Sequence, residues 1–327
     1  MTIAFTLCSN NFLAQAKTLA DSLQHYHPEM KIFLFLVDEK NASVDYSALP
    51  AEIIAVNEEV VPGYAALVNR YSILELNSNL KPFLFDWLVS RHPGITKIYY
   101  LDADTCLYGR MDHVNALLEK EDIVVAPHFL SPVPTDGTEP FENLALNYGT
   151  YNLGFLALNP SSRNARNFLK WWGERTGEFG NNDVANGFFV DQLWMNLAPV
   201  FFEKVHTLRH KGYNMAPWNL HERVISSYEE GKIFLVSGEQ LVHYHFSSFD
   251  PFKPEQVSAK YGRRNFINTP GLKKLYTDYS RRLQENRVGE FSKIGCALPL
   301  KRTKRVGPLR RMLYPVKVLL RSSWKRT

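Results

Sequence analysis

The sequence predicts an α/β fold, with a mostly parallel sheet flanked by helices on both faces. Over the first half of the 327-residue chain, short apolar runs alternate with segments of helical periodicity. One run, KIFLFLVD at 31–38, is apolar almost throughout, as expected for a strand that is covered on both faces. Polar residues follow several of these runs, at the sheet edge where ligands bind in such folds.

Each element has its own justification in the sequence. Short runs rich in apolar residues predict strands, in chain order, at 3–8, 31–38, 52–56, 97–102, 123–126 and 151–158. Apolar residues with helical spacing predict helices at 13–23, 64–77, 80–91 and 161–175. The stretch 128–147 is rich in Pro and turn-forming residues, which predicts a surface loop that acts as a lid or binds a ligand.

Composition is that of an ordinary globular protein, with 45% hydrophobic and 22% charged residues. The three cysteines, Cys8, Cys106 and Cys296, have no repeated spacing, which argues against a disulfide framework or a CxxC zinc site and favours the reducing cytoplasm. The N-terminal residues lack the basic region of a signal peptide, and no run reaches the roughly 20 apolar residues of a membrane span. We therefore expect a protein that does not cross a bilayer.

The C-terminal segment 301–327 is strongly basic. It holds ten Lys or Arg residues and no acid, so without it the net charge of +5 becomes −5 for 1–300. Apolar residues such as Met312 and Trp324 lie between the cations, and Pro315 interrupts a single long helix. This amphipathic pattern favours peripheral attachment to an anionic membrane surface. The alternative is a disordered or nucleic-acid-binding arm, but no nucleic-acid module accompanies it, so no nucleic-acid partner is expected.

The most informative motif is KIYYLDADT at 97–105, a predicted strand that ends directly in Asp-x-Asp. Asp102 and Asp104 would then lie at the ligand edge of the sheet. Two carboxylates suit a hard cation such as Mn²⁺ or Mg²⁺, which also takes oxygens from substrate phosphates and neutralises a departing diphosphate. The competing interpretation is that both residues are turn or cap aspartates, because Asp is common at strand ends.

A second enzyme class also places Asp-x-Asp after a strand. In haloacid dehalogenase-type phosphatases the first Asp is a phosphoryl-accepting nucleophile. Thr105 comes one position too early for that motif, Cys106 stands where Thr or Val is expected, and about a hundred residues precede it here. The phosphatase alternative is weakened and stays open.

The wider set of spaced motifs over residues 3–250 resembles the GT-A glycosyltransferases, in particular family eight, which includes glycogenin and bacterial lipooligosaccharide galactosyltransferases. TLCSNNFLAQAKTLADSL is similar to the opening strand and helix of that family. This resemblance implies a uridine site formed by Thr6, Ser9, Asn11 and Phe12. KPFLFDWLV at 81–89 resembles the segment whose basic residue, here Lys81, contacts the diphosphate; an ordinary surface lysine is the alternative.

Two further segments carry the resemblance toward the sugar. YNLGFLALNP at 151–160 is similar to the family's N-x-G segment, which implies that Asn152 binds sugar hydroxyls and that Gly154 lets the backbone approach the sugar. VDQLWMN at 190–196 resembles the DQ helix start, which implies that Asp191 and Gln192 lie near the anomeric carbon. The alternative for Asp191 is a residue favoured by the helix dipole.

HYHFSSFDPF at 243–252 resembles the segment that supplies the third metal ligand. We prefer His245, which lies nearer the polar turn, and keep His243 second, because residues two apart on a strand share a face. The family's later Gly and Lys-Pro-Trp are replaced by Ser248 and by Asp-Pro-Phe at 250–252, which puts the usual diphosphate-binding lysine in doubt; Lys253 is the candidate to substitute for it. Trp218, in GYNMAPWNLHER, either stacks on a sugar or packs in the core.

The change of periodicity after about residue 255 and the basic tail predict a three-part organisation, and the resemblance implies an activity. The parts are a GT-A catalytic domain at 1–255, a helical extension at 256–300 and the basic tail at 301–327. The activity is transfer of a hexose from a UDP-sugar to a hydroxyl of a cell-surface glycan or lipid-linked acceptor, on the cytoplasmic face of the membrane. Family eight implies retention of configuration; inversion would need a carboxylate base near the acceptor hydroxyl, and because no single residue marks itself as that base, both outcomes stay open. A non-enzymatic alternative is a nucleotide-sugar-binding protein.

Overall fold

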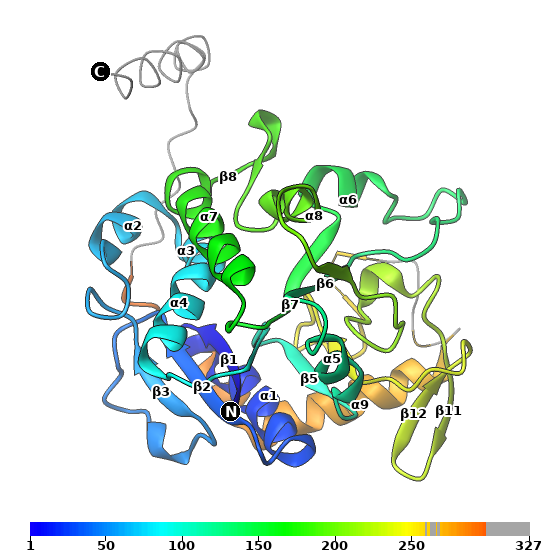
Figure 1. Ribbon diagram of the computed structural model, residues 1–327. Coiled ribbons are helices and arrows are strands. Elements are labelled where there is room, and N and C mark those ends of the chain that lie inside the picture. The colour runs from blue at the N-terminus through cyan, green and yellow to red at the C-terminus, as the bar shows by residue number, and fades with distance from the viewer. Residues whose placement is uncertain (259, 262–265, 267–268, 299–327) are drawn as a thin grey trace.

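The computed structural model describes residues 1–258, 260–261, 266 and 269–298, and the predicted basic tail lies outside them. A seven-stranded sheet occupies the centre of the molecule in the order β10-β6-β7-β4-β1-β2-β3 (Figure 1). Its strands are β1 (Thr2–Cys8), β2 (Lys31–Leu36), β3 (Glu52–Ala55), β4 (Lys97–Leu101), β6 (Ile123–Pro127), β7 (Tyr151–Leu158) and β10 (Val205–Thr207). Only β7 runs antiparallel to its neighbours in this sheet. The predicted α/β class with a mostly parallel sheet is confirmed.

Helices cover both faces of the sheet because successive strand residues point to opposite sides. Ile3 and Phe5 of β1 face a cluster formed with α2 (Tyr64–Arg70), α3 (Ile73–Asn79), α4 (Lys81–Arg91) and α7 (Arg163–Phe179). Ala4 of β1 faces the other side, where Leu19 and Leu23 of α1 (Leu13–Tyr26) and Val114 of α5 (Asp112–Leu117) pack. Both clusters are almost completely buried, so burial of apolar surface from both faces stabilises the sheet.

Two sequence expectations about local structure are corrected. The helix expected at 64–77 is two helices, because the backbone of Tyr71 is extended and Ser72 starts α3 with a capping box to Glu75. The loop expected at 128–147 contains the start of a short helix, α6 (Asn143–Tyr148). Its remaining residues form no regular helix or strand.

Small two-stranded sheets lie outside the central one. The pair β5 (Thr105–Leu107) and β13 (His243–His245) is antiparallel and places His245 opposite Thr105. The other pairs are β8 (Asn182–Asp183) with β9 (Phe188–Phe189), and β11 (Ile225–Glu229) with β12 (Lys232–Leu235). Residues 103–107 and 243–247, far apart in sequence, are thereby brought side by side.

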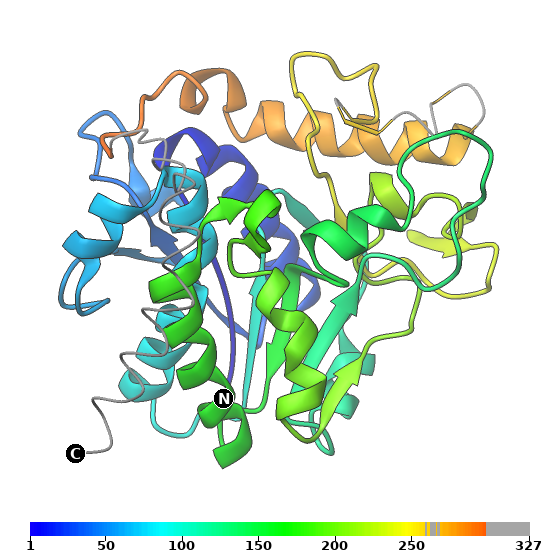
Figure 2. The ribbon, with the colours of Figure 1, turned by 90° about the horizontal axis from the view of Figure 1, so that it is seen from above.

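The C-terminal helices α9 (Pro270–Glu285) and α10 (Val288–Phe291) pack against α1 (Figure 2). Leu272, Leu275 and Tyr276 of α9 belong to the same buried cluster as Leu13 of α1. The short helix α8 (Ala198–Phe201) follows a 3₁₀ helix at Leu193–Leu197. The domain boundary at 255 stays a prediction. Within the described part of the chain, no helix is both long enough and apolar enough to cross a membrane.

Candidate metal centre and adjoining pocket

Three ionisable side chains meet at the carboxyl end of β4. Strand β4 stops at Leu101, a turn carries Asp102 and Asp104, and the pairing of β5 with β13 brings His245 to them. One ligand atom from each of the three lies within 4.8 Å of the others. Nε2 of His245 is 3.1 Å from Oδ1 of Asp104 and 4.0 Å from Oδ2 of Asp102. Two carboxylates and an imidazole at this spacing fit a divalent cation.

His243 does not join this group. Its ring is fully buried, 5.4 Å from the ring of Phe155 between centroids, and its Nδ1 accepts a hydrogen bond from the backbone N of Asn214 at 3.2 Å. Burial lowers the pKa of His243 to about 3, so the ring is held neutral. Of the two histidines considered, the structure brings only His245 to the aspartates.

Asp104 and His245 stabilise each other's charged forms. Burial disfavours ionisation of both groups. The neighbouring imidazole nevertheless lowers the pKa of Asp104, and the Asp104 and Asp102 carboxylates raise the pKa of His245. The protonated form of His245 is therefore favoured beside these carboxylates, and a bound divalent ion would compete with that proton.

Lys81 is buried beside the same carboxylates, which rules out the surface-lysine interpretation. It begins α4, and its Nζ lies 3.0 Å from Oδ2 of Asp191 and 3.6 Å from Oδ1 of Asp102. The ammonium also donates to the backbone O of Leu153 at 3.1 Å and lies 4.7 Å from the centre of the Tyr100 ring. Burial works against its charge, but the two carboxylates raise the pKa of Lys81.

Asp191 is a buried acid beside Lys81. Burial, only partly offset by Lys81, raises the pKa of Asp191 to about 6. The preceding residue, Val190, has φ of +39°, a left-handed conformation that is strained for a β-branched side chain. Such strain costs of order 1–3 kcal/mol and persists where the surrounding structure holds it in place. Here it turns the chain so that the Asp191 side chain points to Lys81.

A chain of amide contacts links the metal centre to Gln192. Nδ1 of His245 lies 3.2 Å from Oδ1 of Asn152, and Nδ2 of Asn152 donates to Oε1 of Gln192 at 3.3 Å. Gly154 makes this arrangement possible: a Cβ there would lie 2.5 Å from Nδ1 of His245 and 2.8 Å from Oδ1 of Asn152. From the sequence, Gly154 was predicted to let the backbone approach a sugar closely. In the structure, the side chain that lies close to Gly154 is that of His245.

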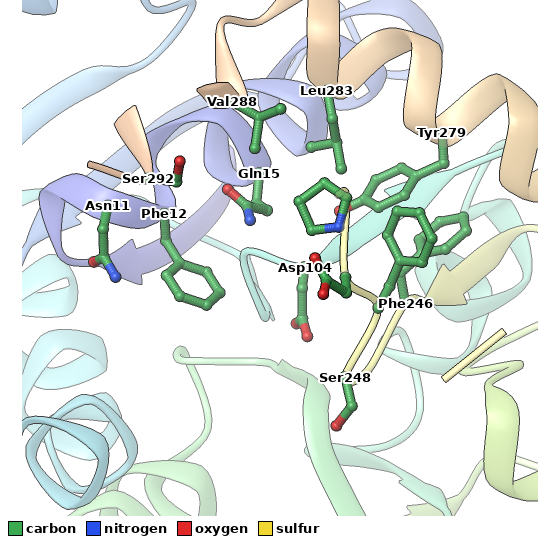
Figure 3. A pocket seen from close by; sticks show the side chains of 13 residues that line it. Asn11, Phe12, Gln15, Asp104, Phe246, Ser248, Tyr279, Leu283, Val288 and Ser292 are labelled. Carbon is green, nitrogen blue, oxygen red and sulfur yellow. The ribbon is translucent and has the colours of Figure 1, made fainter. Parts of the chain in front are cut away.

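A pocket opens next to Asp104 (Figure 3). Asn11 and Phe12, two of the predicted uridine contacts, line it, whereas Thr6 and Ser9 are buried and do not. The lining residues come from α1 and its preceding turn, from the loop after β13, and from the C-terminal helices: Asn11, Phe12, Gln15, Asp104, Phe246, Ser248, Phe249, Asp250, Pro251, Tyr279, Leu283, Val288 and Ser292.

Sequence reasoning missed two contributors to this site. The hydroxyl of Tyr100 donates a hydrogen bond to Asp102, and the position of Tyr100 in β4, two residues before Asp102 in the chain, was a usable signal. The pocket residues of α9 carried no such signal, because they are distant in sequence from every motif. Trp218 is buried, with its ring centre 5.2 Å from that of His245, so it packs behind the metal centre.

Comparison with known proteins gives the following similarities. No protein-family model matches the sequence. The chain is 27% identical over 266 residues to the uncharacterized protein YfnF of Bacillus subtilis (strain 168), across 76% of this chain and 82% of that one. It is 20% identical over 249 residues to the uncharacterized protein YfnD of the same strain, across 75% of this chain and 76% of that one.

Among solved structures, two glycosyltransferases are similar. One is the galactosyltransferase LgtC in complex with donor and acceptor sugar analogs, at 15% identity and a TM-score of 0.49, covering 86% of this chain and 95% of that one. The other is the glycosyltransferase GlyE of Streptococcus pneumoniae TIGR4, at 15% identity and a TM-score of 0.46, covering 90% of this chain and 65% of that one.

Proposed function

We propose that this chain is a metal-dependent glycosyltransferase of the GT-A type that transfers a hexose from a UDP-sugar to a hydroxyl group. The observation that carries the proposal is the convergence of Asp102, Asp104 and His245 beside a pocket at the carboxyl edge of the sheet. Three separate predicted motifs supply the surrounding side chains: Lys81, the pair Asn152 and Gly154, and the pair Asp191 and Gln192. Their meeting at one place supports a shared function.

The three candidate metal ligands also favour one kind of cation. Asp102, Asp104 and His245 would hold it, and when bound it supplies positive charge that neutralises the departing diphosphate. Mg²⁺ prefers oxygen ligands and near-ideal octahedral geometry, whereas an imidazole nitrogen in the set suits a transition ion better. We therefore favour Mn²⁺ over Mg²⁺ as the resident ion.

The remaining residues have roles set by their contacts. Lys81 faces Asp102 and Asp191 at 3.6 and 3.0 Å, so its positive charge acts first on these two carboxylates. Asn152 and Gln192, which already bond to each other, would exchange that contact for hydroxyls of the donor sugar. A retaining course, with Asp191 near the anomeric carbon, is part of the proposal. So are a cell-surface glycan or lipid-linked acceptor and peripheral attachment to the cytoplasmic face through 301–327.

The test is hydrolysis of a panel of UDP-hexoses with Mn²⁺, because a transferase that lacks its acceptor releases the sugar slowly to water. We expect one donor to be consumed and Asp104→Ala to abolish its consumption. Asp112→Ala, at an exposed carboxylate on α5, is the matched control and keeps the rate. Hydrolysis of phosphate esters in place of UDP-hexoses would favour the phosphatase alternative. Tight UDP and Mn²⁺ binding with no donor consumed would favour a binding protein.

A further inference from the structure

The C-terminal helices supply one whole side of the pocket. Tyr279 and Leu283 come from α9, Val288 begins α10, and Ser292 follows its last residue. Figure 3 shows Leu283 and Val288 extending from these helices toward Phe12 and Asp104. This side is apolar apart from the hydroxyls of Tyr279 and Ser292.

Independent contacts hold this side against the sheet domain. Nδ2 of Asn286 donates to Oγ1 of Thr18 at 2.9 Å and to Oδ2 of Asp21 at 3.0 Å, both on α1. The ring of Tyr279 stacks on that of Phe246, with centroids 3.6 Å apart and an interplanar angle of 3°. Since Phe246 directly follows the strand that carries His245, the helices are tied to both walls of the pocket.

A further contact with the sheet domain is made by the segment that follows α10. The backbone N of Ala297 donates to Oδ1 of Asp38 at 2.9 Å, and Oδ2 of the same carboxylate accepts from Nδ2 of Asn10 at 2.8 Å. Asn10 directly precedes Asn11, which lines the pocket. One buried carboxylate at the end of β2 therefore joins the C-terminal segment to the turn that begins the opposite wall.

The opposite wall of the pocket, formed by Asn11, Phe12 and Gln15, combines an aromatic ring with two amide side chains. Phe12 is 42% exposed, a large share for an aromatic ring. Among the described residues, Oδ1 of Asn11 and Oε1 of Gln15 are enclosed and accept no hydrogen bond. Enclosed polar atoms usually have a partner, so two amide oxygens without donors point to a ligand that brings N–H groups. An aromatic face, an apolar face and amide side chains together suit a flat heterocycle.

We infer that α9 and α10 form the nucleobase-facing wall of the donor site, so that residues 279–292 are part of the nucleotide site. This inference rests on the proposed function and deepens it, because it names a second face for the base and adds Gln15 as a contact to its edge. The base lies beside Phe12, on the side of the pocket that these helices close and where Ser292 is exposed, with its diphosphate directed to Asp104.

The experiment compares the binding of UDP and of inorganic pyrophosphate, each with Mn²⁺, by titration calorimetry. Ser292 is exposed and lines the pocket, so Ser292→Trp narrows the base site without disturbing the core. We expect UDP to bind at least about tenfold more weakly, a loss in the range of one base contact, while pyrophosphate binding stays the same. The control is Ser90→Trp, an exposed serine near the end of α4 at the opposite edge of the sheet. Gln15→Met gives a second variant with the same expected pattern.

The following outcomes would overturn the inference about α9 and α10. UDP binding unchanged in both Ser292→Trp and Gln15→Met overturns the inference and leaves the glycosyltransferase proposal intact. Equal loss of UDP and pyrophosphate also overturns it, because the substitution would then act on the metal centre. If the unsubstituted protein binds UDP no better than pyrophosphate, there is no base site. If it binds neither, the proposed function fails and the inference fails with it.

Discussion

Oδ2 of Asp191 lies 3.0 Å from Nζ of Lys81, and both side chains are almost completely buried. Attraction between them offsets part of the cost of placing two charges away from water. The offset is incomplete, since burial still raises the pKa of Asp191 to about 6. The pair also joins two of the predicted motifs, because Lys81 begins α4 and Asp191 follows the strained Val190. Substitution of either residue is therefore expected to change both the stability of the protein and the geometry of the candidate site.

Lys81→Met should destabilise the protein in a pH-dependent way. Removing one partner of a buried ion pair costs about 3–5 kcal/mol because the other charge is left without compensation. The folded-state pKa of Asp191, already raised, should rise further above its unfolded value, so protonation favours the folded variant. The loss in free energy of unfolding should thus be largest near pH 8 and smaller near pH 5. Urea unfolding at both pH values measures it.

The control for this variant is Lys31→Met, which removes an exposed ion pair to Glu52. Its effect should stay below about 1 kcal/mol, the usual worth of a surface pair. A defect of Lys81→Met that is the same at both pH values would show that the Asp191 charge is not its cause.

The two histidines of β13 should behave differently toward the cation. His245→Ala removes a proposed ligand and should weaken Mn²⁺ binding by about 10–100-fold or more, the range seen when even supporting residues of metal sites are lost. His243→Ala should leave Mn²⁺ affinity unchanged, although it lowers stability by opening a buried cavity. Electron paramagnetic resonance of free Mn²⁺ measures both affinities. Comparable loss of affinity in the two variants would refute the assignment of His245 alone.

Gly154→Ala should damage the metal centre without any change of charge. The added Cβ would lie 2.5 Å from Nδ1 of His245 and 2.8 Å from Oδ1 of Asn152, so the imidazole, the amide or the backbone must shift. We expect weaker Mn²⁺ binding and slower donor hydrolysis, each by about tenfold or more, because ligand geometry is held within tenths of an ångström. Gly173→Ala on α7 is the control, since its Cβ would meet atoms only at an ordinary 3.6 Å. Wild-type Mn²⁺ affinity in Gly154→Ala would contradict the described geometry.

His128 should make stability fall on acidification. Its ring is buried, and burial lowers the pKa of His128 to about 4 from the ordinary value near 6.5. A folded-state pKa below the unfolded one means that the neutral ring stabilises the fold above pH 6.5, and that this contribution is lost as the pH falls toward 4. The full loss is about 3 kcal/mol. In His128→Gln, the free energy of unfolding should change less between these pH values, as measured by chemical denaturation. If the stability of the wild type and of His128→Gln had the same pH dependence, the assignment of this effect to His128 would be wrong.

The alternation of apolar runs and helical periodicity was enough to predict the α/β class and most central strands. This works because a strand such as 31–38, covered on both faces, must be apolar along its length. The segment 64–77 was expected as one helix but forms two, since its periodicity continues across the break that Ser72 and Glu75 make with a local hydrogen-bonded cap. The short β10 was not predicted, because three residues carry too little pattern.

For the candidate site, the sequence by itself determined which side chains to consider, because Asp102 and Asp104 end a strand and a strand end must lie at the ligand edge of the sheet. Only the tertiary structure placed His245, and not His243, beside the aspartates, buried Lys81 against Asp191, and brought α9 to the pocket that Phe12 also lines. These are contacts between segments tens to hundreds of residues apart. They depend on how strands pair and helices pack, and periodicity along a chain records only which face a residue takes, not the neighbour that it meets there.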